Sequence, residues 1–192
     1  MTTVADLTAP EFLLDEVQRL RAQVRTLTER AERAEALADH DVLTPVLNRR
    51  GFMTVVSRMM AYCQRHQVPA ALIYLDLDGF KQINDELGHA AGDAALMSVA
   101  ERLLANVRES DAVGRMGGDE FALLLMNAGL EEAQAKARRL AHLLDTEPFP
   151  WKGQSTPLRG SFGVRALEDQ GDPELWLAQA DAAMWLRKKE GR

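Results

Sequence analysis

The chain has 192 residues, 46% of them hydrophobic, which is enough to bury one sizeable core and predicts about one domain. Its net charge of −6 argues against broad electrostatic binding to nucleic acid, although a few local cations can still hold a small phosphorylated ligand. The longest apolar run, around residues 70–75, is far below the roughly 20 residues of a membrane-spanning helix, so we expect no membrane contact.

The N-terminus and the cysteine content indicate the compartment. The first residues are mostly polar, unlike a signal peptide. The single cysteine, Cys63, cannot form an intrachain disulfide, which agrees with a reducing compartment. We therefore expect a cytoplasmic protein.

Residues 1–10 are predicted to be flexible, and a heptad seam follows over residues 11–40. With β-branched residues at the a positions and leucine at the d positions, the seam favours a parallel two-stranded coiled coil. About 30 residues at roughly 1.5 Å each give a rod of about 45 Å. The sequence thus predicts a homodimer joined through this helix. The seam residues recur in steps of four and three: Leu13, Val17, Leu20, Val24, Leu27, Ala31, Ala34 and Ala38.

The flanks of the seam agree with a parallel pair. Glu16 would face Arg21 of a partner, and Arg30 would face Glu35, so both pairs are complementary. The alternative is one amphipathic helix packed on its own domain, which would usually show a wider apolar stripe. The small residues at positions 31, 34 and 38 weaken the seam, and we hypothesise that its register there is soft or switchable.

The pattern changes after residue 40. Pro45 and an asparagine within residues 41–50 predict an irregular segment that leads into a helix. The apolar run over residues 70–77 is typical of a central strand. The other predicted elements are a helix near residues 51–66, a helical turn over 80–87, helices over 93–107 and 130–144, a strand over 159–166 and a closing helix over 173–189.

A hairpin is predicted around two glycines. Extended segments on both sides of Gly117 and Gly118 indicate two strands joined by a two-residue glycine turn. Together with the crossover helices, the hairpin predicts an α/β fold in which helices flank a mixed central β-sheet.

Four acidic residues mark a candidate metal site. Asp76 and Asp78 end a predicted buried strand and point to the same face, and the hairpin carries Asp119 and Glu120. If the carboxylates meet at one edge of the sheet, they suit Mg²⁺, which prefers oxygen ligands and is usually completed by substrate phosphates. Taken singly, each motif has a simpler interpretation, because an Asp-x-Asp pair is often solvated and a Gly-Gly-Asp-Glu segment is often only a turn.

The combination of motifs from residue 41 to residue 192 resembles the GGDEF family of diguanylate cyclases, whose nucleotidyl-cyclase-like fold would then cover this range. The motifs occur in the order of the family: Asp41-x-Leu-Thr with Asn48-Arg49-Arg50, Asp76-Leu-Asp78-Gly-Phe80-Lys81-x-Ile-Asn84-Asp85, Gly88-His89-x-x-Gly92-Asp93, Arg115-x-Gly-Gly-Asp-Glu-Phe121, Ser161-Phe-Gly163, and Ala180-Asp181 with Gly191-Arg192.

The resemblance implies a catalytic metal, Mg²⁺ or Mn²⁺, at the predicted edge of the sheet. Asp76, the carbonyl of Leu77 and Asp119 would hold the ion. Glu120 would be a further ligand or would help to activate the attacking hydroxyl.

The resemblance also implies a GTP site. Asn84 and Asp93 would read the guanine, because a carboxylate accepts from its N–H groups and an amide completes the pattern. The remaining predicted contacts of the substrate are Phe80 beside it, the cations Lys81, Lys188 and Arg192 at the triphosphate, and the backbone of Gly117 and Gly118.

The implied reaction joins two GTP molecules into cyclic di-GMP. One domain holds one GTP, so two domains must face each other across a twofold axis, which gives the predicted coiled coil a function. Arg108 and Asp111 have the spacing of the product-binding inhibitory site of the family, Arg-x-x-Asp, although such a pair is alone more often a solvated salt bridge. The resemblance predicts inhibition by cyclic di-GMP at these two residues.

Few positions depart from the family, and none of them removes a predicted ligand. They are Pro45, Arg159, Trp185 and Arg187. Two rival interpretations remain: a catalytically weak receptor or scaffold that binds cyclic di-GMP, and a coiled-coil adaptor with an inert domain. The sequence leaves two possibilities for activation: a regulatory protein binds the N-terminal helix, or the dimer is constitutively competent.

Overall fold

The computed structural model describes the backbone of residues 9–190 and the side chains of residues 13–28 and 38–189, and it divides into two units, residues 1–38 and 39–192. Helix α1 spans Ala9–Asp39 and makes up the described part of the first unit. The predicted N-terminal helix is therefore present. Within residues 9–190, none of the helices combines the length and the apolarity that crossing a bilayer requires.

The described seam of α1 is exposed in the single chain. Leucine and valine side chains from Leu13 to Leu27 leave 41–63% of their surface accessible. Glu16, expected to face a partner, forms an ion pair with Arg19 of its own helix at 2.9 Å. The predictions for Arg30, Ala31, Ala34 and Glu35 concern side chains outside the described ones.

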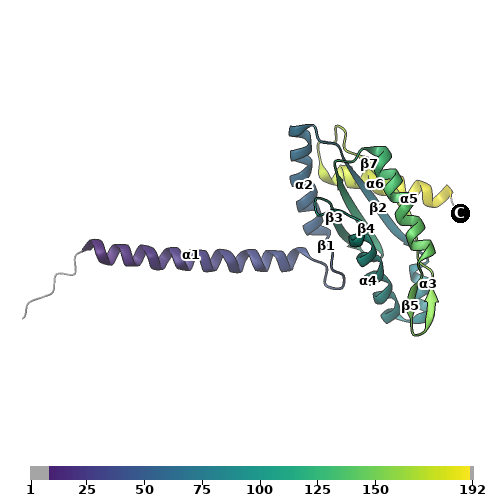
Figure 1. The fold of residues 1–192 in the computed structure, drawn as a ribbon, viewed down its shortest axis with the longest axis horizontal. Helices are drawn as coiled ribbons and strands as arrows, with labels where there is room; N and C mark the ends of the chain where they lie inside the picture. The colour runs from purple at the N-terminus through teal and green to yellow at the C-terminus, as the bar shows by residue number, and fades with distance from the viewer. Residues whose placement is uncertain (1–8, 191–192) are drawn as a thin grey trace, which may run out of the picture. The chain divides into compact units, whose positions relative to one another are not determined.

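The second unit contains a five-stranded sheet and a separate two-stranded hairpin (Figure 1). The sheet order is β1-β3-β4-β2-β7, with β1 parallel to β3 and all other neighbours antiparallel. The predicted mixed sheet flanked by helices is confirmed. In chain order the elements are β1 (Leu47–Asn48), α2 (Arg49–His66), β2 (Ala70–Asp78), α3 (Phe80–Leu87), α4 (His89–Ala105), β3 (Ala112–Gly117), β4 (Glu120–Met126), α5 (Leu130–Thr146), β5 (Phe149–Trp151), β6 (Gln154–Thr156), β7 (Arg159–Ala166) and α6 (Pro173–Glu190).

Helices cover both faces of the sheet, which explains why β2 is a continuous apolar run. Alternate side chains of a strand point to opposite faces, so Ile73 and Leu75 pack in one core with α4 and α5. Leu72 and Tyr74 pack in the other core with α2 and α6. Burial on both faces is the pattern expected of a central strand.

The position of one turn needs correction, and two short elements were not predicted. The turn lies at Gly118 and Asp119 rather than at the two glycines, because β3 continues to Gly117 through an irregular register after Arg115. Gly118 supplies the positive φ of the turn, 50°. The segment expected to be irregular contains β1, and the β5–β6 hairpin was not predicted.

Helix boundaries also differ slightly from the predicted ones. Helix α2 starts before residue 51 because the Asn48 side chain accepts a hydrogen bond from the Gly51 N–H at 2.9 Å, which caps the helix. Helix α4 begins at His89, four residues earlier than predicted.

Candidate active site

The predicted acidic residues meet where β2 ends beside the β3–β4 turn. In the antiparallel register Asp76 lies opposite Glu120. The backbone N–H of Leu77 donates to the Asp119 carbonyl at 3.3 Å, which ties the turn to the end of β2. Asp76, Leu77, Asp119 and Glu120 are thus brought together by strand pairing.

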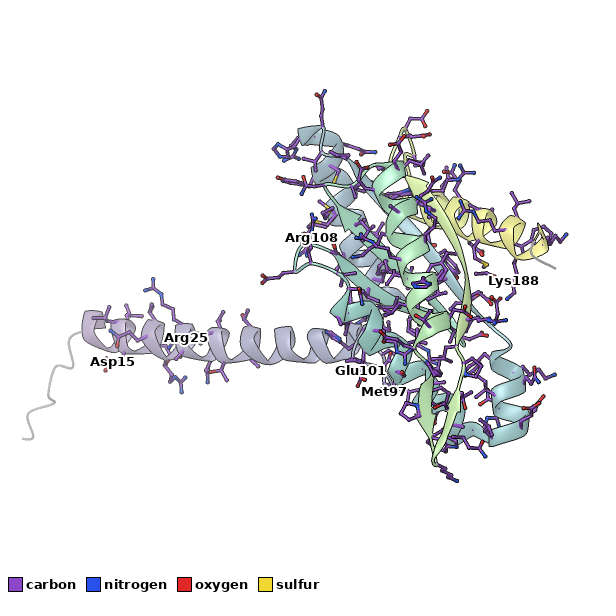
Figure 2. The ribbon with its side chains drawn as sticks, turned by 45° about the vertical axis from the view of Figure 1, so that its right-hand side comes forward. Asp15, Arg25, Met97, Glu101, Arg108 and Lys188 are labelled. Carbon is purple, nitrogen blue, oxygen red and sulfur yellow. The ribbon has the colours of Figure 1, made fainter. Side chains whose placement is uncertain are left out.

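Lys188, labelled on α6 in Figure 2, contacts this edge through its side chain. Its ammonium forms an ion pair with Asp76 and lies 3.6 Å from Oδ1 of Asp78. Burial alone would lower the pKa of Lys188, but the hydrogen bond to Asp76 and the neighbouring carboxylates outweigh it and raise the pKa. Asp78 also accepts a hydrogen bond from the Ser161 hydroxyl at 3.0 Å.

Asp119 and Glu120, the two acids of the hairpin, lie in surroundings that disfavour their charged forms. Burial raises the pKa of Asp119, and the charge of Asp76 adds to the rise, which a backbone hydrogen bond and the charges of Lys188 and Arg115 only partly oppose. Burial likewise raises the pKa of Glu120; a hydrogen bond from Tyr74 opposes the rise, and the charges of Asp181 and Asp76 reinforce it. Both carboxylates would therefore gain from a cation placed between them.

The donor chemistry fits a hard divalent cation, provided that the substrate contributes to its binding. Among the described residues, no three His, Cys, Asp or Glu side chains are arranged to hold a metal by themselves. The site offers carboxylates and, at Leu77, a backbone carbonyl, and Mg²⁺ usually takes one or two carboxylates plus phosphate oxygens. The arrangement is that of an ion shared between protein and a phosphorylated ligand.

The predicted base-reading residues come from two helices that pack together after β2. Gly92 of α4 is buried directly under Asn84 of α3, and a Cβ at Gly92 would lie 2.0 Å from Oδ1 of Asn84. Asp93 follows and is exposed. Phe80 is partly buried beside them, with its Cζ 3.2 Å from the same Cβ position.

The other predicted substrate contacts are distributed more widely. Lys81 is exposed on α3. Gly117 and Gly118 are exposed at the hairpin, and the carbonyl of Gly118 accepts two hydrogen bonds from Arg115, at 2.9 and 2.7 Å. Arg192 lies outside the described residues.

The Arg-x-x-Asp pair is not a side-chain salt bridge. Asp111 accepts hydrogen bonds from the backbone N–H groups of Arg108 and Met126, both at 3.0 Å, so its carboxylate organises the chain before β3. The Arg108 side chain is exposed in the α4–β3 loop (Figure 2). The carboxylate therefore has a structural role that sequence spacing does not reveal.

Two further cations beside this pair were not predicted. Arg108, Asp111, Lys136 and Arg139 line one pocket, the last two from α5. Burial and the positive charge of Arg139 lower the pKa of Lys136; the carboxylate of Asp111 opposes the decrease, and Arg108 adds to it. No local signal identifies them, because basic residues are ordinary on an exposed helix face and only the fold brings α5 to residues 108–111.

Comparison with known proteins gives a family match over the whole second unit. The family model described as "Diguanylate cyclase, GGDEF domain" matches residues 38–192. The probable diguanylate cyclase DgcC of Escherichia coli is 38% identical over 167 residues, which are 86% of this chain and 45% of DgcC. The chain thus spans less than half of that relative.

Solved structures also cover α1. Diguanylate cyclase SiaD of Pseudomonas aeruginosa, solved in complex with its activator SiaC, matches with a TM-score of 0.76 and 30% identity over 96% of this chain and 76% of that chain. The coiled coil and GGDEF domain of DgcB from Caulobacter crescentus, solved with c-di-GMP, matches with a TM-score of 0.81 over 94% of this chain and 96% of that chain. At 23% identity, the DgcB match shows the fold alone.

Proposed function

The chain belongs to the GGDEF family, and on that premise we propose that it is a diguanylate cyclase, which condenses two GTP molecules into cyclic di-GMP and releases two pyrophosphates. The observation that carries the proposal is the pairing of Asp76 with Glu120 beside the Asp119 turn, with Lys188 in ion contact at the same edge. Acidic oxygens and a cation at one edge suit a metal-bound triphosphate.

The chemistry is a pair of nucleotidyl transfers, each a displacement at an α-phosphorus. The 3′-hydroxyl oxygen of one GTP attacks the α-phosphorus of the other, the bond to the β-phosphate oxygen breaks, and pyrophosphate leaves as the hydroxyl proton is lost. A second displacement in the opposite sense closes the ring. A bound Mg²⁺ or Mn²⁺ would neutralise charge on the phosphates.

Residues of the chain would bind the cation, the triphosphate and the base. Asp76, the Leu77 carbonyl and Asp119 would hold the cation, and Glu120 would complete that set or accept the proton of the hydroxyl. Lys188 and Lys81 would pair with the triphosphate. Asn84 and Asp93 would orient the base, supported by the close packing of Asn84 on Gly92.

Each chain would present one GTP, so turnover requires two chains facing each other. The exposed apolar seam of α1 supports a parallel homodimer, because leucine and valine side chains left in water would gain from mutual burial. Joining the two domains raises their effective concentration. The same helix is where we propose that a regulatory protein binds, by analogy with SiaD, whose solved complex contains an activator.

Product inhibition is proposed at the pocket of Arg108 and Asp111. The exposed guanidinium of Arg108 can donate hydrogen bonds to a phosphate or to a guanine edge. Lys136 and Arg139 add positive charge beside it. Because GTP is a cytoplasmic nucleotide, the proposal also places the reaction in the cytoplasm.

The test is a reaction of the purified chain with GTP and Mg²⁺, with the nucleotides separated by chromatography and Glu120→Gln run in parallel. Cyclic di-GMP formed only by the unmodified chain would support the proposal. If neither chain forms product while cyclic di-GMP still binds, the chain is a receptor or scaffold instead.

A further inference from the structure

Tyr74 is a core residue whose hydroxyl reaches the candidate active site. It lies in β2 two residues before Asp76, on the same face of the sheet, and is only 5% exposed. Its ring packs in the core shared with α2 and α6. Its hydroxyl donates a hydrogen bond to Oε2 of Glu120 at 3.2 Å.

The packing of the ring does not require the hydroxyl. The neighbouring positions of this core are filled by Leu72, Ala122 and Leu124, all apolar and all fully buried. A phenol buried among such side chains needs a polar partner, since an unsatisfied buried hydroxyl is unfavourable. Here the partner is a carboxylate of the candidate active site.

Glu120 has negatively charged neighbours, so a hydrogen bond from the Tyr74 hydroxyl stabilises its carboxylate. Asp76, Asp119 and Asp181 all act on Glu120 with negative charge. The ammonium of Lys188 contacts Asp76 rather than Glu120. Within the described residues, the hydrogen bond that holds Glu120 in this acidic surrounding is the one from Tyr74.

A carboxylate with one anchored oxygen presents the other in a restricted direction. With Oε2 bound by Tyr74 in the core, Oε1 remains for a cation or for the attacking hydroxyl. Groups that hydrogen-bond to a metal ligand in this way orient it, and their loss typically weakens metal affinity or activity by about 10–100-fold.

We propose that Tyr74 is a positioning residue, whose hydroxyl holds the Glu120 carboxylate in its working orientation. The inference rests on the proposed cyclase function and adds a positioning residue to it. With 5% of its surface exposed and its hydroxyl on Oε2 of Glu120, Tyr74 would act through Glu120 rather than on the reacting atoms.

The kinetic test compares Tyr74→Phe with Tyr62→Phe. The chain has two tyrosines, and Tyr62 is a matched control because it is half-exposed on α2 with its ring against His66. We expect Tyr74→Phe to lower kcat by about tenfold, the effect of losing one hydrogen bond to a charged group. The KM for GTP should rise by no more than about tenfold, because the ion that Glu120 would help to hold is shared with the triphosphate while the base contacts are untouched, and the melting temperature should not fall.

A second readout does not depend on turnover. Mn²⁺ is titrated by electron paramagnetic resonance into the chain with a GTP analogue whose α,β-bridge cannot react. Tyr74→Phe should raise the half-saturating Mn²⁺ concentration by about tenfold, and Tyr62→Phe should leave it unchanged. In a Glu120→Ala background, Tyr74→Phe should have no further effect on Mn²⁺ binding, because its target is missing.

The outcomes separate this inference from the cyclase proposal. Unchanged kcat and Mn²⁺ affinity in Tyr74→Phe would overturn the inference and leave the cyclase proposal intact. A parallel loss of kcat, GTP binding and melting temperature would assign Tyr74 to packing alone and also overturn it. If the unmodified chain forms no cyclic di-GMP, the proposed function fails, and the Mn²⁺ titration still decides whether Tyr74 positions Glu120.

Discussion

Arg115 joins Asp41, two residues beyond the end of α1, to the turn of the candidate active site. Its Nη1 donates to Oδ1 of Asp41 at 3.0 Å, while its Nε and Nη2 donate to the Gly118 carbonyl. The two side chains of the ion pair are each only 15% exposed. Asp41 is itself fixed by the hydroxyl and N–H of Thr44, at 2.7 and 2.8 Å. One guanidinium therefore links the segment after α1 to the turn of the candidate active site.

Asp41→Asn should weaken this link in a pH-dependent way. Burial alone would raise the pKa of Asp41, but the hydrogen bonds from Thr44 and the charge of Arg115 outweigh it and lower the pKa. A lowered pKa contributes stability above the ordinary Asp value of about 3.9, and that stability is lost as pH falls through the folded-state value. Thermal melts should show Asp41→Asn less stable by about 1–3 kcal/mol near neutral pH and equal to the unmodified chain in strong acid.

The control for Asp41→Asn is Asp145→Asn, which removes an exposed ion pair with Arg159. Such a pair contributes about 0–1 kcal/mol, so melting should hardly change. Equal melting of Asp41→Asn and the unmodified chain at neutral pH would contradict a structural role of the Asp41–Arg115 pair.

Gly92→Ala should weaken GTP binding through Asn84. The new Cβ would lie 2.0 Å from Oδ1 of Asn84, so the amide must move away from its observed place. Losing one or two hydrogen bonds to the base should raise KM for GTP by about tenfold with a smaller effect on kcat. Gly171→Ala is the matched control, because nothing lies within 4 Å of its Cβ position. Equal KM values in steady-state kinetics would show that Asn84 does not read the base.

Asp119→Asn should stabilise the metal-free protein while abolishing activity. The pKa of Asp119 is raised by burial and by Asp76. A raised pKa means that the contribution of Asp119 is most favourable below about pH 3.9 and is lost as pH rises through the folded-state value. At neutral pH, removing the charge should raise the melting temperature, by about 2–4 °C for each kcal/mol gained.

The stabilisation should disappear in acid, where Asp119 is protonated in both states. Asp169→Asn, at an exposed position after β7, should leave melting unchanged. A lower melting temperature for Asp119→Asn at neutral pH without metal would contradict the electrostatic strain inferred for the turn.

Arg108→Ala should relieve product inhibition. Removing the exposed guanidinium should raise the inhibitory concentration of cyclic di-GMP by at least about tenfold and leave the uninhibited rate unchanged, because a charged hydrogen-bond donor to the ligand is lost. Arg65→Ala, another exposed arginine, is the control. Asp111→Ala is a poor test, since its carboxylate accepts two backbone N–H groups and its loss would disturb the start of β3. Unchanged inhibition in Arg108→Ala would refute the proposed inhibitory site.

The elements that carry the candidate site were predicted because their signals are local. Residues 70–77 alternate between two cores, and a continuous apolar run that ends in two aspartates identifies both the strand and its functional end. The glycines before Asp119 identify the hairpin. Antiparallel pairing then places Glu120 opposite Asp76, which the sequence motifs suggest but do not specify.

What was missed depends on contacts between distant segments. The short strand β1 forms because residues 47–48 pair with β3, and propensity over two residues cannot predict that pairing. The turn lies one residue later than predicted because β3 continues to Gly117 through an irregular register after Arg115. Tyr74 contacts Glu120, and Arg139 lines the pocket of Arg108, because of the elements that pack beside them. Within its own strand or helix, neither residue carries a sequence signal that identifies it.

The most direct test of the cyclase proposal measures both products of one GTP reaction. Pyrophosphate and cyclic di-GMP are quantified together after incubation of the purified chain with GTP and Mg²⁺. We expect two pyrophosphates for each cyclic di-GMP, and neither product from Glu120→Gln. Release of phosphate with GDP, or pyrophosphate without the cyclic dinucleotide, would contradict it.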